Sequence, residues 1–184
     1  MRGTMIIVAL IGLKKSGKTT TAEALIREFK ARGYKVGGVK FMILSKFTVD
    51  TEGKDTWRHK EAGADVVVSL SRDELAYIER LDGHASLDDA LEHIPRDIDV
   101  LICEGLTEER DGILRIIVAR EIDLLPDTLE IRGIRDGVIA LTGIMANKVK
   151  EHPIYPVFNC TVEEEASALV DLIIEESETP VGES

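Results

Sequence analysis

The chain has 184 residues, 44% of them apolar, and carries a formal net charge of −11. This length suits one compact domain better than two large ones, and the ordinary apolar share excludes a globally disordered chain. The acidic balance argues against nucleic-acid binding, which usually needs a basic face.

The first predicted elements are a buried strand and an amphipathic helix joined by a glycine-containing turn. Residues 5–11 form a continuous apolar run, and Ala22, Leu25, Ile26 and Phe29 recur at helical spacing before Gly33, which we expect to end the helix. Between them, residues 12–19 read GLKKSGKT, the complete G-x-x-x-x-G-K-[ST] pattern of a phosphate-binding loop.

The middle of the chain alternates short strands and helices. We expect strands at 34–40 and 65–70, and a helix over 55–62 that Asp55 caps and Gly63 ends. Residues 41–54 have no clear period and predict a functional loop or a hairpin excursion. Residues 74–81 fit a strand or a helix, and Ser86 with Asp89 predicts a helix that ends near Ile94.

The second half adds four predicted strands, at 99–105, 114–119, 138–142 and 155–158, and a last helix opened by a capping box of Thr161 and Glu164. Apolar strands that alternate with helices predict an α/β fold with a mainly parallel sheet. We expect a single nucleotide-binding domain over residues 1–176 and a disordered acidic tail at 177–184.

The loop residues predict how the chain binds phosphate. Glycines allow a close backbone approach, backbone N–H groups point at phosphate oxygens, and the helix N-terminus favours negative charge. We expect the lysine to reach the β- and γ-phosphates and the threonine hydroxyl to ligate Mg²⁺. The predicted phosphate-binding residues are Gly12, Lys14, Lys15, Ser16, Gly17, Lys18, Thr19 and Thr20.

Glu104 is the predicted acidic partner of Thr19 at the metal. It follows four apolar residues, as the acid of a Walker B strand does, and parallel strands bring their carboxyl ends to one sheet edge. The alternative is a simple strand-end carboxylate. Gly105 either allows close approach to a phosphate or merely turns the chain.

A polar segment at residues 50–64 holds the remaining candidates, together with the only tryptophan. Asp50 and Asp55 are candidate metal ligands, and Arg58 is a candidate phosphate contact. The alternative is a capped surface helix with solvated charges. Asn147 follows a strand within Asn147-Lys148, as a guanine-reading N-K-x-D motif would, but Lys150 stands where the aspartate belongs. Asn147 is therefore either a base contact or an ordinary loop residue.

Two further expectations concern the cell compartment. Cys103 and Cys160 lie far apart in apolar surroundings, which predicts buried, reduced thiols. No apolar stretch approaches the roughly 20 residues of a membrane span, and no cleavage site of the signal-peptide type follows the first apolar run. We expect a cytoplasmic protein without membrane contact.

Together, the phosphate loop, Gly33-Tyr34-Lys35-Val36, the block GKDTWRHKEAGA at residues 53–64, and Glu104-Gly105 resemble the MobB family of molybdopterin-guanine dinucleotide biosynthesis adapters. The resemblance covers about residues 5–120 and, more loosely, the last helix. It implies a P-loop NTPase fold, with three α/β/α layers and a mainly parallel (mixed) sheet. It further implies that the protein binds GTP and Mg²⁺, hydrolyses GTP weakly at most, and forms a homodimer. It also implies assistance to the guanylyltransferase MobA, and contact with molybdoenzymes or with the molybdopterin cofactor.

The chain departs from this family after the second predicted strand. It reads Lys40-Phe41-Met42 where many members carry histidine, so a role of those histidines is not carried over. An alternative function is that of a small-molecule kinase or ATP-dependent ligase, for which Arg110, Arg132 and Arg135 lie in segments that look like loops. A third is a regulatory switch whose 41–54 segment becomes ordered on nucleotide binding. The sequence assigns no catalytic residue.

Overall fold

A computed structural model describes residues 4–42, 48–81, 83 and 85–179. The chain divides into two compact units, one made of Met1–Phe41 with Leu87–Ser184 and the other of Met42–Ser86. The expectation of a single domain over residues 1–176 stays a prediction. Most of the segment 41–54 falls in the second unit, and residues 43–47 of it lie outside the described residues.

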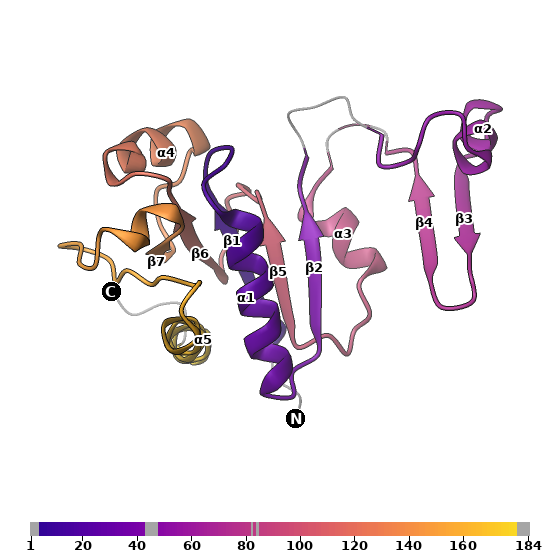
Figure 1. Ribbon diagram of the computed structural model, residues 1–184. Coiled ribbons are helices and arrows are strands. Elements are labelled where there is room, and N and C mark those ends of the chain that lie inside the picture. Colours follow the sequence, from indigo (N-terminus) through magenta and orange to yellow (C-terminus); the bar gives the residue numbers. More distant parts are fainter. Residues whose placement is uncertain (1–3, 43–47, 82, 84, 180–184) are drawn as a thin grey trace. The chain divides into compact units, whose positions relative to one another are not determined.

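The first unit is built on a five-stranded sheet. Its strands follow the order β2-β5-β1-β6-β7, and each neighbouring pair is parallel. Figure 1 shows them side by side, with β1 in the middle and the turn into α1 at its carboxyl end. The strands are β1 (Ile6–Ile11), β2 (Val36–Lys40), β5 (Val100–Glu104), β6 (Ile113–Val118) and β7 (Val138–Thr142).

Both faces of the sheet are covered, because successive strand residues point to opposite sides. Val8 and Leu10 belong to the core that includes helices α1 (Lys18–Ala31) and α5 (Glu163–Glu178). Ala9 and Ile11 belong to the core that includes helices α3 (Leu87–His93) and α4 (Leu125–Arg132). The predicted three-layer α/β/α fold with a mainly parallel sheet is confirmed.

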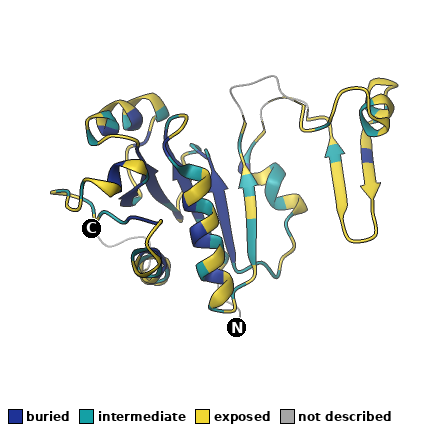
Figure 2. Ribbon diagram, in the orientation of Figure 1, coloured by how far each residue is buried: buried dark blue, intermediate teal, exposed yellow. Residues whose placement is uncertain are grey.

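The second unit contains helix α2 (Asp55–Glu61) and an antiparallel hairpin of β3 (Val66–Leu70) and β4 (Leu75–Glu79). The hairpin settles residues 74–81 as a strand. Val67 is buried, whereas most of the hairpin is exposed, as the yellow strands of Figure 2 show.

Two predicted helix caps are wrong. The N-cap of α2 is Lys54, and Asp55 lies inside the first turn without a side-chain cap. The N-cap of α5 is Val162, so Thr161 and Glu164 form no capping box. Thr161 instead donates its backbone N–H and its hydroxyl to Oδ1 of Asn159, at 3.1 and 2.7 Å. The helix begins one residue later than the pattern predicts, and the Thr161 hydroxyl bonds to Asn159 instead of to the helix N-terminus.

The chain after β6 also differs from expectation. Residues 155–158 form only an isolated bridge between Leu141 and Val157. Short 3₁₀ helices, Ile122–Leu124 and Ile144–Asn147, precede α4 and follow β7. Helix α4 itself, with Arg132 in its last turn, was expected as a loop. Helix α5 continues to Glu178, past the start of the predicted tail, of which residues 180–184 lie outside the described residues.

Candidate functional site

The phosphate loop lies at the carboxyl end of β1, packed tightly against the neighbouring strand. A Cβ atom at Gly12 would lie 2.1 Å from the carbonyl oxygen of Val118 and 2.7 Å from Oγ of Ser16, so only glycine fits there. Lys15 and Gly17 both adopt positive φ, 60° and 103°. Left-handed residues that alternate with right-handed ones curl the backbone into a concavity whose N–H groups suit an anion.

Lys18 spans the loop. Its Nζ donates to the carbonyl oxygens of Gly12 at 3.1 Å and Leu13 at 2.7 Å. Burial, and next the positive charge of Arg132, lower the pKa of Lys18. The ammonium is thus held where an anion would stabilise its charged form.

Thr19 and Glu104 meet as the sequence predicts. The Thr19 hydroxyl donates to Oε1 of Glu104 at 2.7 Å, although 85 positions separate the two residues. Pairing of β1 with β5 produces this contact, because Leu10 lies beside Glu104 at the same sheet edge. Lys40 at the end of β2 lies 3.6 Å from Oε2 of the same carboxylate.

These residues fit a bound phosphate and a magnesium ion. Oγ of Ser16 is buried and has no hydrogen-bond partner in the described part of the chain, which is what a hydroxyl awaiting a ligand oxygen would show. No cluster of three or more His, Cys, Asp or Glu side chains occurs among the described residues. Mg²⁺ in proteins is commonly bound by one or two carboxylates together with phosphate oxygens and water. Glu104 would supply the carboxylate and Thr19 a hydroxyl oxygen.

A small cavity of about 110 Å³ adjoins the loop on the β7 side. The N–H of Ile144 donates to the carbonyl oxygen of Ser16 at 3.1 Å, which fixes the loop against the end of β7. The lining residues come from the start of α1, the end of β7 and the segment before α5: Gly17, Thr20, Thr21, Thr142, Gly143, Ile144, Asn147, Asn159, Cys160 and Thr161.

Asn147 lines this cavity, with its amide already engaged. Its Nδ2 donates to the carbonyl oxygen of Ile144 at 3.0 Å, and its Oδ1 accepts from Nδ2 of Asn159 at 3.1 Å. Lys150, at the aspartate position of the incomplete guanine motif, lies 3.5 Å from the carboxylate of Glu165. Base contact by Asn147 therefore stays a prediction.

Three further candidates lie in the second unit, so their roles at a ligand stay predictions. Oδ1 of Asp50 accepts from the hydroxyl of Thr56 at 2.9 Å, near the start of α2. Asp55 is exposed and lies 4.0 Å from Arg58, which is also exposed. These contacts account for a locally braced helix start and leave metal or phosphate binding open.

Gly105 turns the chain after β5. It adopts φ 81°, and its N–H donates to the carbonyl oxygen of Leu10 at 2.9 Å, which holds the turn beside the phosphate loop. Lys14 and Lys15 are exposed at the loop. The predicted loop residues, Glu104 and Gly105 are thus brought together.

Sequence reasoning missed two parts of this region. Asn159 and Cys160 carry no recognisable motif, yet they line the cavity beside Gly17. Arg132, named from the sequence only for the kinase or ligase alternative, donates from Nη2 to the carbonyl oxygen of Gly12 at 3.1 Å. No local signal could have found this contact, because it joins residues 120 positions apart.

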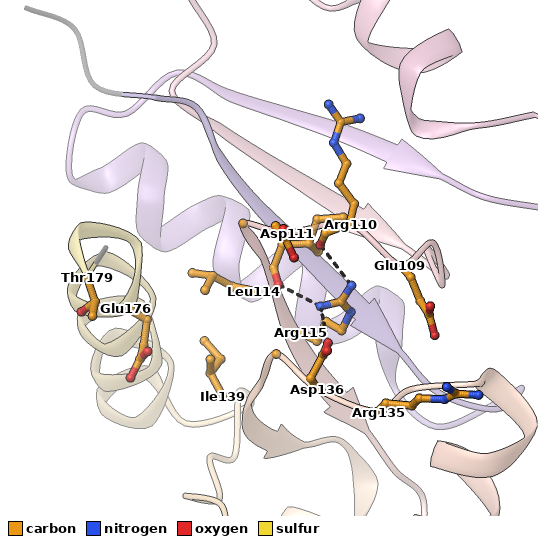
Figure 3. Close-up of a pocket in the computed structure, with 13 residues that line it drawn as sticks. Glu109, Arg110, Asp111, Leu114, Arg115, Arg135, Asp136, Ile139, Glu176 and Thr179 are labelled. Atoms are coloured by element: carbon orange, nitrogen blue, oxygen red, sulfur yellow. Dashed lines mark hydrogen bonds and ion pairs between the residues drawn. The ribbon is translucent and has the colours of Figure 1, made fainter. Parts of the chain in front are cut away.

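A larger cavity of about 740 Å³ lies elsewhere, at the amino-terminal ends of β6 and β7 (Figure 3). Arg115 beside it is 5% exposed and donates to the carbonyl oxygens of Ile113, Glu108 and Arg110. Its donors are thus used by the protein itself. Ligands of parallel α/β sheets bind at the carboxyl ends of the strands, so the smaller cavity at the loop is the better candidate.

The cysteine prediction is confirmed, because Cys103 and Cys160 are both free and buried. Burial raises the pKa of Cys103 to about 12, and burial likewise raises the pKa of Cys160. Within the described ranges, no helix combines the length and the apolar character needed to cross a membrane.

Comparison with known proteins identifies the family. The family model described as Molybdopterin guanine dinucleotide synthesis protein B matches residues 7–135. A curated Haemophilus influenzae protein, described as molybdopterin-guanine dinucleotide biosynthesis adapter protein, is 34% identical over 122 residues, which cover 66% of this chain and 67% of that protein.

Solved structures agree on the fold. The crystal structure of Bacillus subtilis MobB aligns with a TM-score of 0.72 and 22% identity, covering 91% of this chain and 98% of that one. A MobB homologue from Bacillus stearothermophilus aligns with a TM-score of 0.65 and 21% identity, covering 96% and 100%. The family model spans more than half of the chain, and from this match we conclude that the chain belongs to the MobB family.

Proposed function

We propose that the chain is a GTP- and Mg²⁺-binding adapter in the biosynthesis of molybdopterin guanine dinucleotide, where it assists the guanylyltransferase MobA. The observation that carries the proposal is the 2.7 Å contact between Thr19 and Glu104 beside the phosphate loop. It supports a nucleotide-metal site in a chain whose family takes its name from this pathway. Family membership favours this accessory role over the kinase or ligase alternative.

The site is locally cationic although the chain is acidic. Five cations lie on or beside the loop, and Glu104 supplies a carboxylate there. These cations are Lys14, Lys15, Lys18, Lys40 and Arg132. A nucleotide phosphate would balance this excess of positive charge. Thr19 and Glu104 would hold Mg²⁺, which neutralises phosphate charge when bound.

The guanine assignment rests on the family name and on the cavity beside Gly17. At about 110 Å³ this cavity is well below the roughly 300–1,000 Å³ of whole-ligand pockets. It suits one fragment of a nucleotide, such as its base, with the phosphates along the loop. Asn147 and Asn159 line this cavity, and to contact a guanine their amides would exchange the 3.1 Å bond that joins them for bonds to the base.

Isothermal titration calorimetry of GTP and of ATP, each with Mg²⁺, tests the proposal. Lys18→Ala should abolish GTP binding, whereas Lys30→Ala, an exposed lysine at the far end of α1, should leave it unchanged. Equal affinities for GTP and ATP would remove the guanine assignment. Absence of binding by the unsubstituted chain would remove the nucleotide site.

We expect hydrolysis of GTP to be slow. The sequence contains no glutamine, so the residue that orients the attacking water in many GTPases is missing. Single-turnover hydrolysis with Mg²⁺ faster than about one per second would argue against an adapter role.

The proposed homodimer draws support from the hairpin of the second unit. The register places Val68 opposite Tyr77 and Leu70 opposite Leu75 on one face, where these side chains are 43–74% exposed. Exposed apolar faces of this kind mark association surfaces.

Light scattering after size exclusion tests the dimer. Val68→Lys should shift the mass from dimer towards monomer, and Glu74→Lys in the turn is the matched control. A monomeric unsubstituted chain at high concentration would refute self-association. Direct binding to MobA is tested separately, by co-elution of the two purified proteins.

A further inference from the structure

Arg132 brings a second, partly buried cation to the phosphate loop, beside Lys18. It stands in the last turn of α4, which lies near the loop in Figure 1. Its Nη2 donates to the carbonyl oxygen of Gly12 at 3.1 Å, the same oxygen that accepts from Nζ of Lys18 at 3.1 Å. Two positive charges therefore converge on one neutral acceptor.

This convergence is costly without an anion. Like charges repel in partly buried surroundings, and the charge of Arg132 is the second cause, after burial, of the lowered pKa of Lys18. Nε of Arg132 is buried as well, and it has no hydrogen-bond acceptor among the residues that the structure describes. A phosphate oxygen would supply both the missing charge and an acceptor for the guanidinium, whose planar fork suits phosphate.

We propose that Arg132 binds the terminal phosphate of the nucleotide in the loop, so that the site favours nucleoside triphosphates over diphosphates. This rests on the proposed nucleotide-binding function and adds a residue that supplies phosphate discrimination from outside the loop motif. The contact with Gly12 positions the guanidinium, and the donors left over make the new bonds. The competing explanation is a purely structural link between α4 and the loop.

The two explanations predict different patterns of affinity. Calorimetry with Mg²⁺ would compare GTP with GDP and ATP with ADP, on the unsubstituted chain and on Arg132→Ala. We expect Arg132→Ala to weaken triphosphate binding about tenfold and diphosphate binding less than about twofold. The substitution removes one charged hydrogen bond to the terminal phosphate, and a diphosphate lacks that phosphate. Arg135→Ala, an exposed arginine three residues further on, is the control and should change neither.

Arg132→Gln separates charge from the structural link, because its amide can still donate to Gly12. If Arg132→Ala unfolds, this variant carries the test, and circular dichroism checks its fold. An equal loss for tri- and diphosphates, or no loss at all, overturns the inference. If the unsubstituted chain binds GTP and ATP, and the variants keep the same ratio of triphosphate to diphosphate affinity, only this inference fails. If the unsubstituted chain binds neither, the proposed function fails and takes the inference with it.

Discussion

Gly12→Ala would test whether the phosphate loop depends on its close packing against β6. The new Cβ atom would lie 2.1 Å from the carbonyl oxygen of Val118, about 0.9 Å inside the 3.0 Å limit that real Cβ atoms respect. The obstacle is backbone of β6, which is paired on both sides, so the loop must move instead. Overpacking of a tight site costs about 1–3 kcal/mol, and we expect the upper end, about 3 kcal/mol.

The assay is thermal unfolding followed by far-ultraviolet circular dichroism. The only tryptophan, Trp57, lies in the second unit, so its fluorescence would report on the wrong part of the chain. A loss of about 3 kcal/mol corresponds to a Tm lower by about 6–12 °C for a chain of this size. GTP affinity should fall in the same variant, because a loop displaced by nearly 1 Å misplaces its N–H groups.

Gly38→Ala is the matched control. Gly38 lies in β2, and an added Cβ would meet nothing within 4 Å. Its replacement should leave the Tm unchanged or raise it slightly, since alanine has less conformational freedom to lose on folding. If Gly12→Ala keeps its Tm within about 1 °C of the unsubstituted chain and binds GTP equally well, the packing argument is wrong.

Three further predictions follow from single side chains. Glu104→Gln should weaken GTP binding about tenfold or more in buffer with Mg²⁺ and change it little in buffer with EDTA, as measured by calorimetry. Equal losses of affinity in both buffers would speak against a metal role of Glu104. Cys103 should resist thiol reagents at pH 8 until the chain unfolds, and because its folded pKa is raised from 9.0 to about 12, the free energy of unfolding should fall as pH rises above about 9. Arg32→Ala should lower that free energy by about 1 kcal/mol at pH 7, since Arg32 bonds Glu28 and Ser167 between α1 and α5. The hydrogen bond from Arg32, followed by that from Ser167, lowers the pKa of Glu28. The stability that these bonds contribute is therefore present above the pKa of Glu28 in the unfolded chain, and it is lost as pH falls through the pKa in the folded chain. Urea titrations at pH 7 and pH 3 should show a smaller effect of Arg32→Ala at pH 3.

Much of the candidate nucleotide site could be predicted from local sequence. The motif from Gly12 to Thr19 predicts the conformation of the loop, because its glycines and the helix that follows it can all be read from adjacent residues. Glu104 could be found at a distance because a continuous apolar run predicts a buried strand, and parallel strands end at one edge. The helix stop at Gly33 is confirmed by its φ of 87° and by the N–H of Tyr34 donating to the carbonyl oxygen of Phe29.

Capping patterns were less reliable, because they depend on the residue at which the folded helix begins. Thr161 has the right neighbours for a capping box, but α5 begins after Val162 and the Thr161 hydroxyl donates to Oδ1 of Asn159. Asp55 has the right side chain for a cap, yet Lys54 occupies the N-cap. The first residue of a helix depends on tertiary geometry that a one-dimensional pattern does not contain.

The sequence by itself determined the α/β class, the phosphate loop and its acidic partner, because each is written in adjacent residues or in the periodicity of one strand. Only the tertiary structure decided what else reaches the loop. Strand order places β6 beside β1 and β7 beyond β6, and so carries Arg132 to Gly12, and Asn159 to the cavity beside Gly17. Contacts across more than a hundred residues follow from how the sheet is assembled, and no local pattern records that order.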